Sequence, residues 1–322
     1  MRKQEELAQK KVLVTGGAGF IGSAFVRNFS SLFKYMYIVD SLTYAGNLKR
    51  IHSEISKTNV EFIESDILDV NNYQKIIKEL DFVVHFAAES HVDRSIKDGF
   101  PFVNTNILGT FTLLENIRIN ENIKTLVVST DEVYGSILQG EASESAILDP
   151  SSAYSASKAS ADLLSLAQFK THKQNILISR CSNNYGPYQD SEKFIPTVIK
   201  SLKKDEPVEI YGDGKNVREW IHVDDHCEAL LIILIEGIAG EIYNIGSGSR
   251  FTNLEIVELI SKLMGLEKYE NKFIQDRKGH DFRYSLNSTK IKENFKWSPK
   301  VTLEEGLKDL IVNYEIYQRN MK

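Results

Sequence analysis

The chain has 322 residues, with 39 Lys and Arg against 44 Asp and Glu, so its formal net charge is −5. Without a long basic run, this balance gives no electrostatic footprint for nucleic acid, and we expect no nucleic-acid partner. A hydrophobic content of 42% is typical of a globular protein with a large core, and the longest aliphatic run, residues 229–235, is far shorter than the ~20 residues that a membrane-spanning helix requires, so we expect no membrane partner.

Apolar runs and helical patterns alternate along the first part of the chain. Strands are predicted at residues 11–15, 35–39, 60–63, 81–86, 124–129 and 175–178, and helices from the glycine segment that ends at Gly22 through residue 29, and at residues 71–80, 102–120 and 153–173. This alternation predicts an α/β fold with a Rossmann-type, doubly wound parallel sheet covered by helices on both faces.

The pattern changes at about residue 183, where segments become shorter and strands no longer alternate regularly with helices. We therefore predict a large domain over residues 1–182 and a smaller lobe over residues 183–322, with residues 220–245 returning to the large domain. Capping boxes at Thr252-Asn-Leu-Glu255 and Thr302-Leu-Glu-Glu305 predict two helix starts in the lobe, and Asp224-Asp225 is a candidate cap for a helix that runs to Ile235. A cleft between the two parts is the expected ligand site.

Three glycines, Gly16, Gly19 and Gly22, follow the first predicted strand and open the first predicted helix. Missing side chains at these positions let backbone N–H groups approach a pyrophosphate and let the helix pack closely on the strand. A glycine pattern alone is weak evidence, but Asp40 at the end of the second strand stands where a carboxylate binds the ribose hydroxyls of a dinucleotide. Because this carboxylate repels a 2′-phosphate, the sequence predicts NAD rather than NADP as the cofactor.

The segment Tyr154-Ser-Ala-Ser-Lys158 lies within a predicted helix, where residues four apart share a face. An ammonium beside a phenol favours the phenolate, so we expect Lys158 to lower the pKa of Tyr154 and make it a usable base. Such a pair also occurs by chance on solvated helices, and the upstream glycine loop is what favours catalysis.

The strand at residues 124–129 ends in Thr130, Asp131 and Glu132, at the edge where doubly wound sheets bind ligands. A hydroxyl at this position can hydrogen-bond a substrate oxygen together with Tyr154. An alcohol–ketone exchange needs no carboxylates, however, so two adjacent acids indicate further proton transfers: an acid for a leaving hydroxyl and a base for a carbon-bound proton.

Taken together, these motifs resemble the extended short-chain dehydrogenase/reductase family, and within it the dTDP-glucose 4,6-dehydratase branch. The matching stretches run nearly end to end: residues 15–23, 42–47, 85–95, 129–135, 154–160, 181–187 and 277–281. Residues 88–93 and the pair Asp131-Glu132 are the specific ones, because the related sugar epimerases lack the acid pair.

The resemblance implies a role for individual residues. It implies NAD contacts, with Asp66 at the adenine, for Phe20, Ile21, Asp40, Thr43, Asp66, Ile67, Ala87, Ala88, Thr105, Tyr154, Lys158 and Asn184. It implies sugar-nucleotide contacts for Ser90, Thr130, Asn183, Lys193, Arg218, Asn253, Arg277 and His280, and the two guanidiniums suit a diphosphate. The chain departs from the family pattern at residues 189–192, where a polar pair replaces an aromatic residue and a proline, and at Lys278, which replaces a proline.

The activity implied is the conversion of dTDP-glucose into its 4-keto-6-deoxy derivative and water through an internal NAD redox cycle. The catalytic residues would be Thr130, Asp131, Glu132, Tyr154 and Lys158. Three other activities remain open: a UDP-sugar 4-epimerase, a UDP-glucuronate decarboxylase, and a 4,6-dehydratase of a UDP- or GDP-sugar. Asp131 argues against the epimerase and the decarboxylase, since neither expels a hydroxyl. A redox-sensing NAD-binding module without catalysis is a further alternative, against which the intact Thr130, Tyr154 and Lys158 argue.

The resemblance also implies a homodimer formed through the two long helices that begin at Phe102 and Ala153. The two cysteines, Cys181 and Cys227, stand in unrelated contexts, which argues against a disulfide scaffold or a zinc site. We therefore expect no metal. The polar first eleven residues lack an apolar signal core, and we expect a reducing, cytoplasmic compartment.

Overall fold

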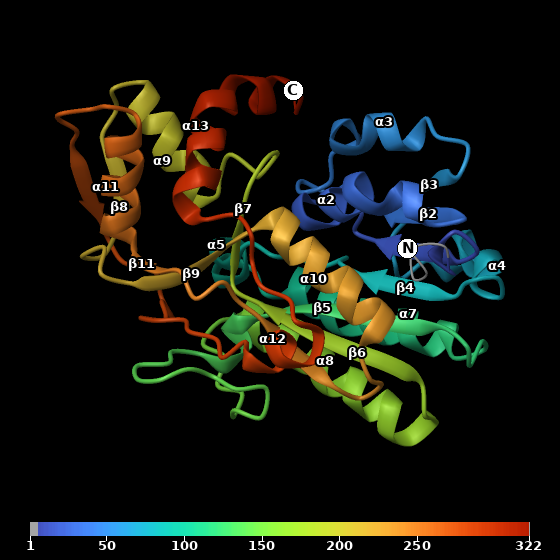
Figure 1. Ribbon diagram of the computed structural model, residues 1–322. Helices are drawn as coiled ribbons and strands as arrows, with labels where there is room; N and C mark the ends of the chain where they lie inside the picture. The colour runs from blue at the N-terminus through green and yellow to red at the C-terminus, as the bar shows by residue number, and fades with distance from the viewer. Residues whose placement is uncertain (1–5, 322) are drawn as a thin grey trace.

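The structure, a computed structural model, describes residues 6–321. The predicted domains, 1–182 and 183–322, also include residues 1–5 and 322, which lie outside the described residues. A seven-stranded sheet forms the centre, with all neighbouring strands parallel and the order β10-β6-β5-β4-β1-β2-β3. Its strands are β1 (Lys11–Thr15), β2 (Tyr35–Asp40), β3 (Val60–Glu64), β4 (Phe82–His85), β5 (Lys124–Thr130), β6 (Asn175–Cys181) and β10 (Ile242–Ile245). The predicted doubly wound parallel sheet is confirmed (Figure 1).

Helices cover the sheet on both faces. One core packs α2 (Phe20–Phe29), α10 (Val223–Glu236) and α12 (Thr289–Phe295) against the strands, and the other packs α4 (Gln74–Ile77), α7 (Thr110–Ile117) and α8 (Ala153–His172). Short helices α3 (His52–Ile55), α5 (Val92–Lys97) and α6 (Phe100–Phe102) and single turns η1 (Ser30–Leu32), η2 (Leu48–Ile51), η3 (Val70–Asn72) and η5 (Asp131–Tyr134) complete this part. Within residues 6–321, no helix combines the length and apolarity needed to cross a bilayer.

A smaller lobe lies beside the carboxyl ends of the strands (Figure 1). It contains a three-stranded sheet of β11 (Arg250–Thr252), β9 (Val217–His222) and β7 (Asn183–Tyr185), and a two-stranded sheet of β12 (Asn271–Ile274) and β8 (Val208–Tyr211). Helices α9 (Phe194–Lys203), α11 (Asn253–Leu263) and α13 (Leu303–Arg319) share a separate core with these strands. Both predicted capping boxes are confirmed at the starts of α11 and α13. Because α10 and β10 return to the large sheet, the chain crosses between the two parts more than once.

The structure corrects the predicted helix at residues 71–80. Only η3 and α4 form there, and Tyr73 between them has φ −130°. The Tyr73 ring is fully buried and its hydroxyl donates to the Ile67 carbonyl oxygen at 2.5 Å, so its tertiary contacts override the helical pattern.

The helix predicted at residues 102–120 is also different in detail. It begins earlier, at Phe100, and contains a π-helical segment, η4 (Val103–Gly109), before α7. Inside this segment the buried Asn106 side chain bonds both backbone groups of Glu89 and the Ser157 hydroxyl. These bonds tie the segment to the loop after β4, beside the predicted site, where π-helical segments are often found.

The predicted cap of the helix running to Ile235 is wrong. His222 is the N-cap of α10, and its ring accepts from the Asp224 N–H at 3.3 Å. Asp224 and Asp225 lie in the first turn instead, where negative charge also stabilises the helix dipole.

Candidate active site

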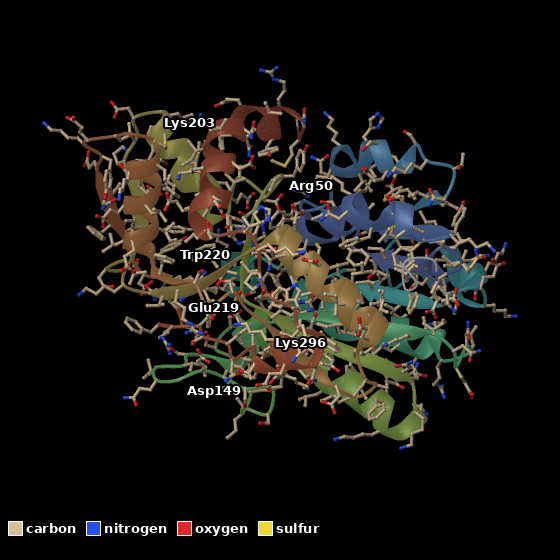
Figure 2. All side chains as sticks on the ribbon, in the orientation of Figure 1. Arg50, Asp149, Lys203, Glu219, Trp220 and Lys296 are labelled. Carbon is tan, nitrogen blue, oxygen red and sulfur yellow. The ribbon has the colours of Figure 1, made fainter. Side chains whose placement is uncertain are left out.

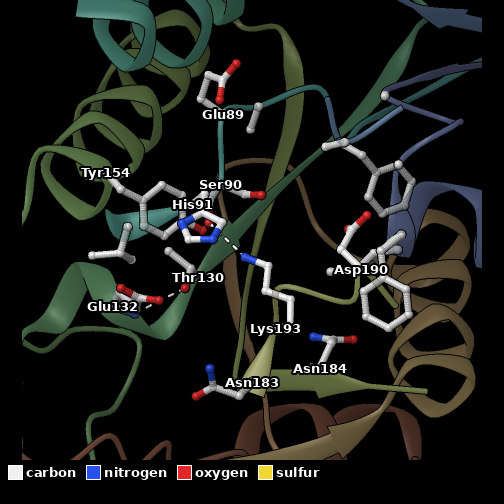
Figure 3. Close-up of a pocket in the computed structure, with 18 of the residues that line it drawn as sticks. Glu89, Ser90, His91, Thr130, Glu132, Tyr154, Asn183, Asn184, Asp190 and Lys193 are labelled. Carbon is white, nitrogen blue, oxygen red and sulfur yellow. Dashed lines mark hydrogen bonds between the residues drawn. The ribbon is translucent and has the colours of Figure 1, made fainter. Parts of the chain in front are cut away.

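One cavity of about 540 Å³ lies between the carboxyl ends of the large sheet and the smaller lobe. Every residue that the sequence nominated lines it. The residues nominated for NAD alone are Gly16, Gly19, Phe20, Ile21, Gly22, Asp40, Thr43, Asp66, Ile67, Ala87, Ala88, Thr105 and Asn184; the catalytic and sugar-nucleotide candidates are Ser90, Thr130, Asp131, Glu132, Tyr154, Lys158, Asn183, Lys193, Arg218, Asn253, Arg277 and His280. Figure 3 shows Lys193 pointing across this space between Asp190 on one side and Tyr154 and Glu132 on the other.

The glycine loop is shaped by the absence of side chains. Gly16 has φ +69°, and a Cβ there would lie 2.6 Å from the Ala87 backbone nitrogen. A Cβ on Gly22 would lie 2.2 Å from the Gly16 carbonyl oxygen, which keeps the start of α2 against the end of β1. The loop therefore fits a pyrophosphate at the helix N-terminus, with bare backbone facing the cavity.

Asp40 closes the same end of the cavity. Its side chain accepts hydrogen bonds from the Ala18 N–H and the Leu42 N–H, both at 2.9 Å. Burial raises the pKa of the Asp40 carboxyl, while these two bonds oppose the rise. Each carboxylate oxygen has a further lone pair, so the group is oriented and still free to accept from a ribose diol.

The three residues after β5 form a compact polar group. Thr130 caps the turn η5: its Oγ1 accepts from the Glu132 N–H and donates to Asp131 Oδ1, each at 3.3 Å. Burial raises the pKa of Asp131 well above its ordinary value, and the charges of Glu132 and Glu219 raise it further. Burial also raises the pKa of Glu132, but the positive charges of Arg277, Arg218 and Lys193 oppose that rise. The two neighbouring acids thus differ, with Asp131 better suited to keep a proton.

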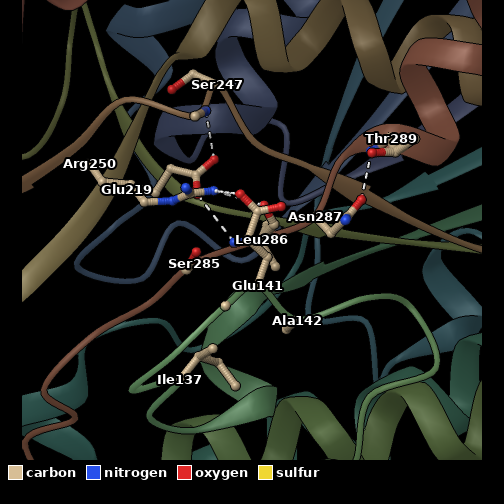
Figure 4. Close-up of polar contacts among 12 residues, drawn as sticks. Ile137, Glu141, Ala142, Glu219, Ser247, Arg250, Ser285, Leu286, Asn287 and Thr289 are labelled. Atoms are coloured by element: carbon tan, nitrogen blue, oxygen red, sulfur yellow. Dashed lines mark hydrogen bonds and ion pairs between the residues drawn. The ribbon is translucent and has the colours of Figure 1, made fainter.

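Glu219 is a fully buried carboxylate on β9 that sequence analysis missed. It accepts from the Gly248 N–H at 2.9 Å, from Arg250 Nε at 2.9 Å and from the Leu286 N–H at 3.2 Å (Figure 4). Arg250 also donates to Glu141 at 2.7 Å, which links the lobe to the loop after β5. These fixed donors hold a second negative charge in the neighbourhood of Asp131.

The pair on α8 lies where the sequence places it, but its electrostatics differ from expectation. Lys158 is buried and its ammonium donates to the Val128 carbonyl oxygen at 2.7 Å. The pKa of Tyr154 is raised well above its ordinary value rather than lowered, because burial dominates and Glu132 adds to it; a hydrogen bond with Thr130 opposes the rise. The expected lowering by Lys158 is therefore wrong for this arrangement of residues.

The smaller lobe contributes three cations to the cavity: Lys193, Arg218 and Arg277. Arg218 is held by the Asp281 carbonyl oxygen at 2.9 Å, and Lys193 donates to the Ser90 carbonyl oxygen at 3.3 Å. Burial lowers the pKa of His280 to about 4, so its ring is neutral at pH 7. This concentration of positive charge suits a diphosphate.

Several buried polar atoms in the cavity wall have no hydrogen-bond partner among residues 6–321. They include Asp131 Oδ2, Asn183 Oδ1, His91 Nδ1 and Arg277 Nε. Unpaired buried polar atoms are costly in a folded protein, which indicates a polar ligand that satisfies them.

Tyr284 is a second residue that the sequence did not reveal. Its hydroxyl lies 2.8 Å from Asp281 Oδ2 and 3.4 Å from Glu132 Oε2, and its ring lies under the Arg218 guanidinium at 4.3 Å. No local motif marks it, because it reaches Glu132 across 152 positions of sequence.

Comparison with known proteins places the chain among sugar-nucleotide enzymes. The family model described as GDP-mannose 4,6 dehydratase matches residues 13–310. A dTDP-glucose 4,6-dehydratase of Streptomyces niveus is 43% identical over 310 residues, covering 94% of this chain and 92% of that protein. The low-salt glycan biosynthesis protein Agl12 of Haloferax volcanii is 45% identical over 304 residues, covering 94% and 98%.

Solved structures of sugar-nucleotide enzymes also superpose on this chain. The crystal structure of DesIV, a dTDP-glucose 4,6-dehydratase from Streptomyces venezuelae with NAD and TYD bound, superposes with a TM-score of 0.93 at 42% identity, covering 96% of this chain and 98% of that one. A UDP-glucuronic acid 4-epimerase from Bacillus cereus has a TM-score of 0.88 at 30% identity, covering 94% and 99%. The fold is thus shared by several activities, and identity is higher to the dehydratases.

Proposed function

Because the chain belongs to the GDP-mannose 4,6-dehydratase family, and resembles its dTDP-glucose-specific members over nearly its whole length, we propose that it is an NAD-dependent dTDP-glucose 4,6-dehydratase. Its product is the 4-keto-6-deoxy sugar nucleotide, and water is released. The 4-epimerase alternative is not favoured, because the 4-epimerase structures are only about 30% identical to this chain, against 43% for the dTDP-glucose 4,6-dehydratase of Streptomyces niveus.

The observation that carries this proposal is the acid pair at the end of β5. Asp131 and Glu132 line the same cavity as Tyr154 and three cations, and their environments differ in charge. Oxidation at one carbon needs a single base, whereas elimination of a hydroxyl needs an additional acid and base.

The residues of the glycine-loop end fit NAD. When bound, NAD would supply the redox chemistry, as the acceptor and later the donor of one hydride. The backbone of Gly16, Gly19 and Gly22 would face the pyrophosphate, Asp40 would accept from the adenosine ribose, and Lys158 would reach the nicotinamide ribose. The other proposed cofactor contacts, with Asp66 at the adenine, are Phe20, Ile21, Thr43, Ile67, Ala87, Ala88, Thr105 and Asn184.

Each proton transfer is proposed for one side chain. Tyr154, assisted by Thr130, takes the proton of the C4 hydroxyl, which requires its phenolate and therefore a lower pKa in the ternary complex than burial gives it in the protein alone. Once C4 is a ketone, the C5 proton is acidified, and Glu132 removes it as the C5–C6 double bond forms. Asp131 protonates the C6 hydroxyl, which leaves as water, and C5 is afterwards protonated again.

The substrate is proposed to lie along the smaller lobe. Arg218 and Arg277 would bind the diphosphate, whose charge matches their fixed guanidiniums. Ser90, Asn183, Lys193, Asn253 and His280 would contact the rest of the sugar nucleotide. We propose residues 1–182 as mainly the NAD domain and residues 183–322 as mainly the sugar-nucleotide lobe, with about 220–245 returning to the large domain.

A homodimer is proposed through the helices at residues 100–117 and α8. Large apolar side chains are exposed on them, including Phe100, Val103, Leu108, Phe111 and Leu163, and such clusters mark interaction surfaces. The reaction's need for NAD and a nucleotide sugar supports a cytoplasmic location.

The test is an incubation with dTDP-, UDP-, GDP- and CDP-glucose, with products weighed by mass spectrometry. Loss of one water from dTDP-glucose, faster than from the other nucleotides, is expected. A product of unchanged mass would contradict the proposed dehydration.

A further inference from the structure

Arg50, at the end of η2, is a buried arginine with only 3% of its surface exposed (labelled in Figure 2). All five of its N–H donors have acceptors, which is the full capacity of a guanidinium. The acceptors are the carbonyl oxygens of Tyr188 (3.1 Å), Ala18 (3.1 Å) and Ala45 (2.5 Å), the carboxylate of Asp190 (2.6 Å) and the Met321 sulfur (3.8 Å).

These acceptors come from both sides of the cleft. Ala18 belongs to the glycine loop and Ala45 to the loop after β2, both in the large domain. Tyr188 and Asp190 belong to the loop after β7 in the smaller lobe, and Met321 follows α13. One guanidinium therefore joins the two parts of the molecule directly.

The junction lies at the cofactor end of the cavity. Ala45 and Asp190 line the same space as the glycine loop and Asp40. In Figure 3, Asp190 lies on the side of the cavity away from Tyr154 and Glu132. The Arg50–Asp190 contact thus spans the cleft beside the groups that fit the adenosine and pyrophosphate of NAD, not beside the proposed chemistry.

Opening the cleft at this point is unfavourable for an electrostatic reason. Asp190, whose side chain is 31% exposed, supplies a carboxylate to the Arg50 guanidinium, whose side chain is 1% exposed. Separating such a pair leaves a buried charge uncompensated, which costs far more than breaking an exposed ion pair.

Neighbouring contacts hold the Asp190 loop in place. The Arg27 guanidinium lies 4.6 Å from the centre of the Tyr188 ring, and the Tyr317 ring packs against the same ring at 5.2 Å. Arg27 also donates to the Arg50 carbonyl oxygen at 3.1 Å. Tyr188 itself has φ +64°, an uncommon conformation for a non-glycine residue that persists where surrounding contacts enforce it.

We propose that Arg50 and Asp190 form a latch that closes the two lobes over NAD and slows its release. The inference rests on the proposed function, in which NAD ends each turnover in the form in which it began, so release is not a step of the cycle. Arg50 is a positioning residue, since it holds the lobe rather than the reacting atoms.

The test measures NAD release from the holoenzyme. The protein is loaded with radiolabelled NAD and chased with excess unlabelled NAD, and the label retained is followed over time by gel filtration. Asp190→Asn is expected to speed release at least tenfold, and Asp190→Glu, which restores the carboxylate, is expected to recover most of the wild-type rate. Lys300→Met removes an exposed ion pair with Glu228 and is the matched control, with release at the wild-type rate.

A double-mutant cycle separates a latch from a direct contact. If Asp190 acts through Arg50, Asp190→Asn adds little to Arg50→Met, whereas independent effects would multiply. Arg50→Lys replaces Arg50→Met if the latter does not fold. The latch would be overturned if Asp190→Asn released NAD at the wild-type rate, or if the effects of the two substitutions on the release rate multiplied in the double variant. Either result would overturn it even if the enzyme dehydrates dTDP-glucose. The latch would also be overturned if the wild-type protein retained no NAD but still bound and dehydrated the substrate when NAD was added. Absence of dehydration, by contrast, counts against the proposed function.

Discussion

The two ends of the cavity are lined by different kinds of chemical group. The glycine-loop end is mostly backbone and small side chains, and its carboxylate Asp40 already accepts from the Ala18 and Leu42 N–H groups. The opposite end carries charges of both signs, together with buried polar atoms such as Asp131 Oδ2 and Arg277 Nε that have no partner among residues 6–321. The second end thus holds charged and polar groups that only a bound ligand satisfies.

This difference separates binding from chemistry. Substitutions at the glycine-loop end should change which cofactor binds and how long it stays, with smaller effects on rate. Substitutions at the charged end should change rate or substrate affinity while NAD stays bound.

Tyr154→Phe is expected to give the largest loss, about 10²–10⁴-fold in turnover, because the C4 hydroxyl loses its proposed base. NAD should remain bound, since only one hydroxyl is removed from the cavity wall. Turnover and NAD content per protein are measured together. Tyr243→Phe, which removes a buried hydroxyl outside the cavity lining, is the control, and wild-type turnover in Tyr154→Phe would remove this residue from the mechanism.

Asp131→Asn and Glu132→Gln should each slow elimination, by about 10²–10³-fold, within the range for a lost general acid or base. Initial oxidation is spared, so absorbance at 340 nm from reduced cofactor should build up on the enzyme. Equal loss of oxidation in both variants would show that the acids do not act after it.

The pH profile distinguishes the two acids. Asp131 must carry a proton when it acts, and burial beside Glu132 and Glu219 raises its pKa, so activity should persist above the ordinary range of a carboxyl and fall as pH rises through the raised pKa. Glu132 must be ionised, so activity should also fall as pH drops through its own pKa. In Asp131→Asn the alkaline fall assigned to Asp131 should disappear; its persistence would assign that limb to another group.

Arg277→Met is expected to raise KM for dTDP-glucose by about tenfold to a hundredfold, the equivalent of ~1.5–3 kcal/mol for a lost charged hydrogen bond. The NAD content should not change, because Arg277 lies at the other end of the cavity. Arg283→Met, whose guanidinium binds backbone carbonyls outside the cavity lining, is the matched control. An equal rise in KM for both variants would point to a general loss of structure.

Asp40→Ser should have the smallest effect on rate and should act on cofactor choice. Removing the carboxylate deletes a charge that repels a 2′-phosphate and an acceptor for a ribose hydroxyl, so the preference for NAD over NADP should fall about tenfold. Isothermal titration with both cofactors measures this. Equal affinity of the wild-type protein for NAD and NADP would show that Asp40 does not select the cofactor.

The sequence predicted the residues of the glycine-loop end better than it predicted the long-range contacts around the cavity. The apolar runs of the strands, the glycine spacing and the four-residue step from Tyr154 to Lys158 are local signals. They predicted six of the seven strands of the sheet, missing the edge strand β10, and nominated residues that all line one cavity. The π-helical segment at Val103–Gly109 could not be predicted, because it depends on Asn106 bonding Glu89 and Ser157.

The sequence also could not predict pKa shifts or contacts between residues far apart in the chain. The raised pKa of Tyr154 depends on how completely the fold buries the phenol, which the Tyr154–Lys158 spacing does not reveal. Glu219 and the Arg50–Asp190 pair join residues far apart in the chain, 140 positions in the second case. Such contacts leave no periodic pattern in the sequence.

In the proposed reaction, one cavity carries out oxidation, elimination and return of the same hydride. The direct measurement uses dTDP-glucose deuterated at C4, with the product analysed by NMR and mass spectrometry. The account predicts the C4 deuterium at C6 of the product, the loss of one water, and, when the reaction is run in D₂O, one solvent deuteron at C5. Deuterium lost to solvent, or a product that keeps its C6 hydroxyl, would contradict it.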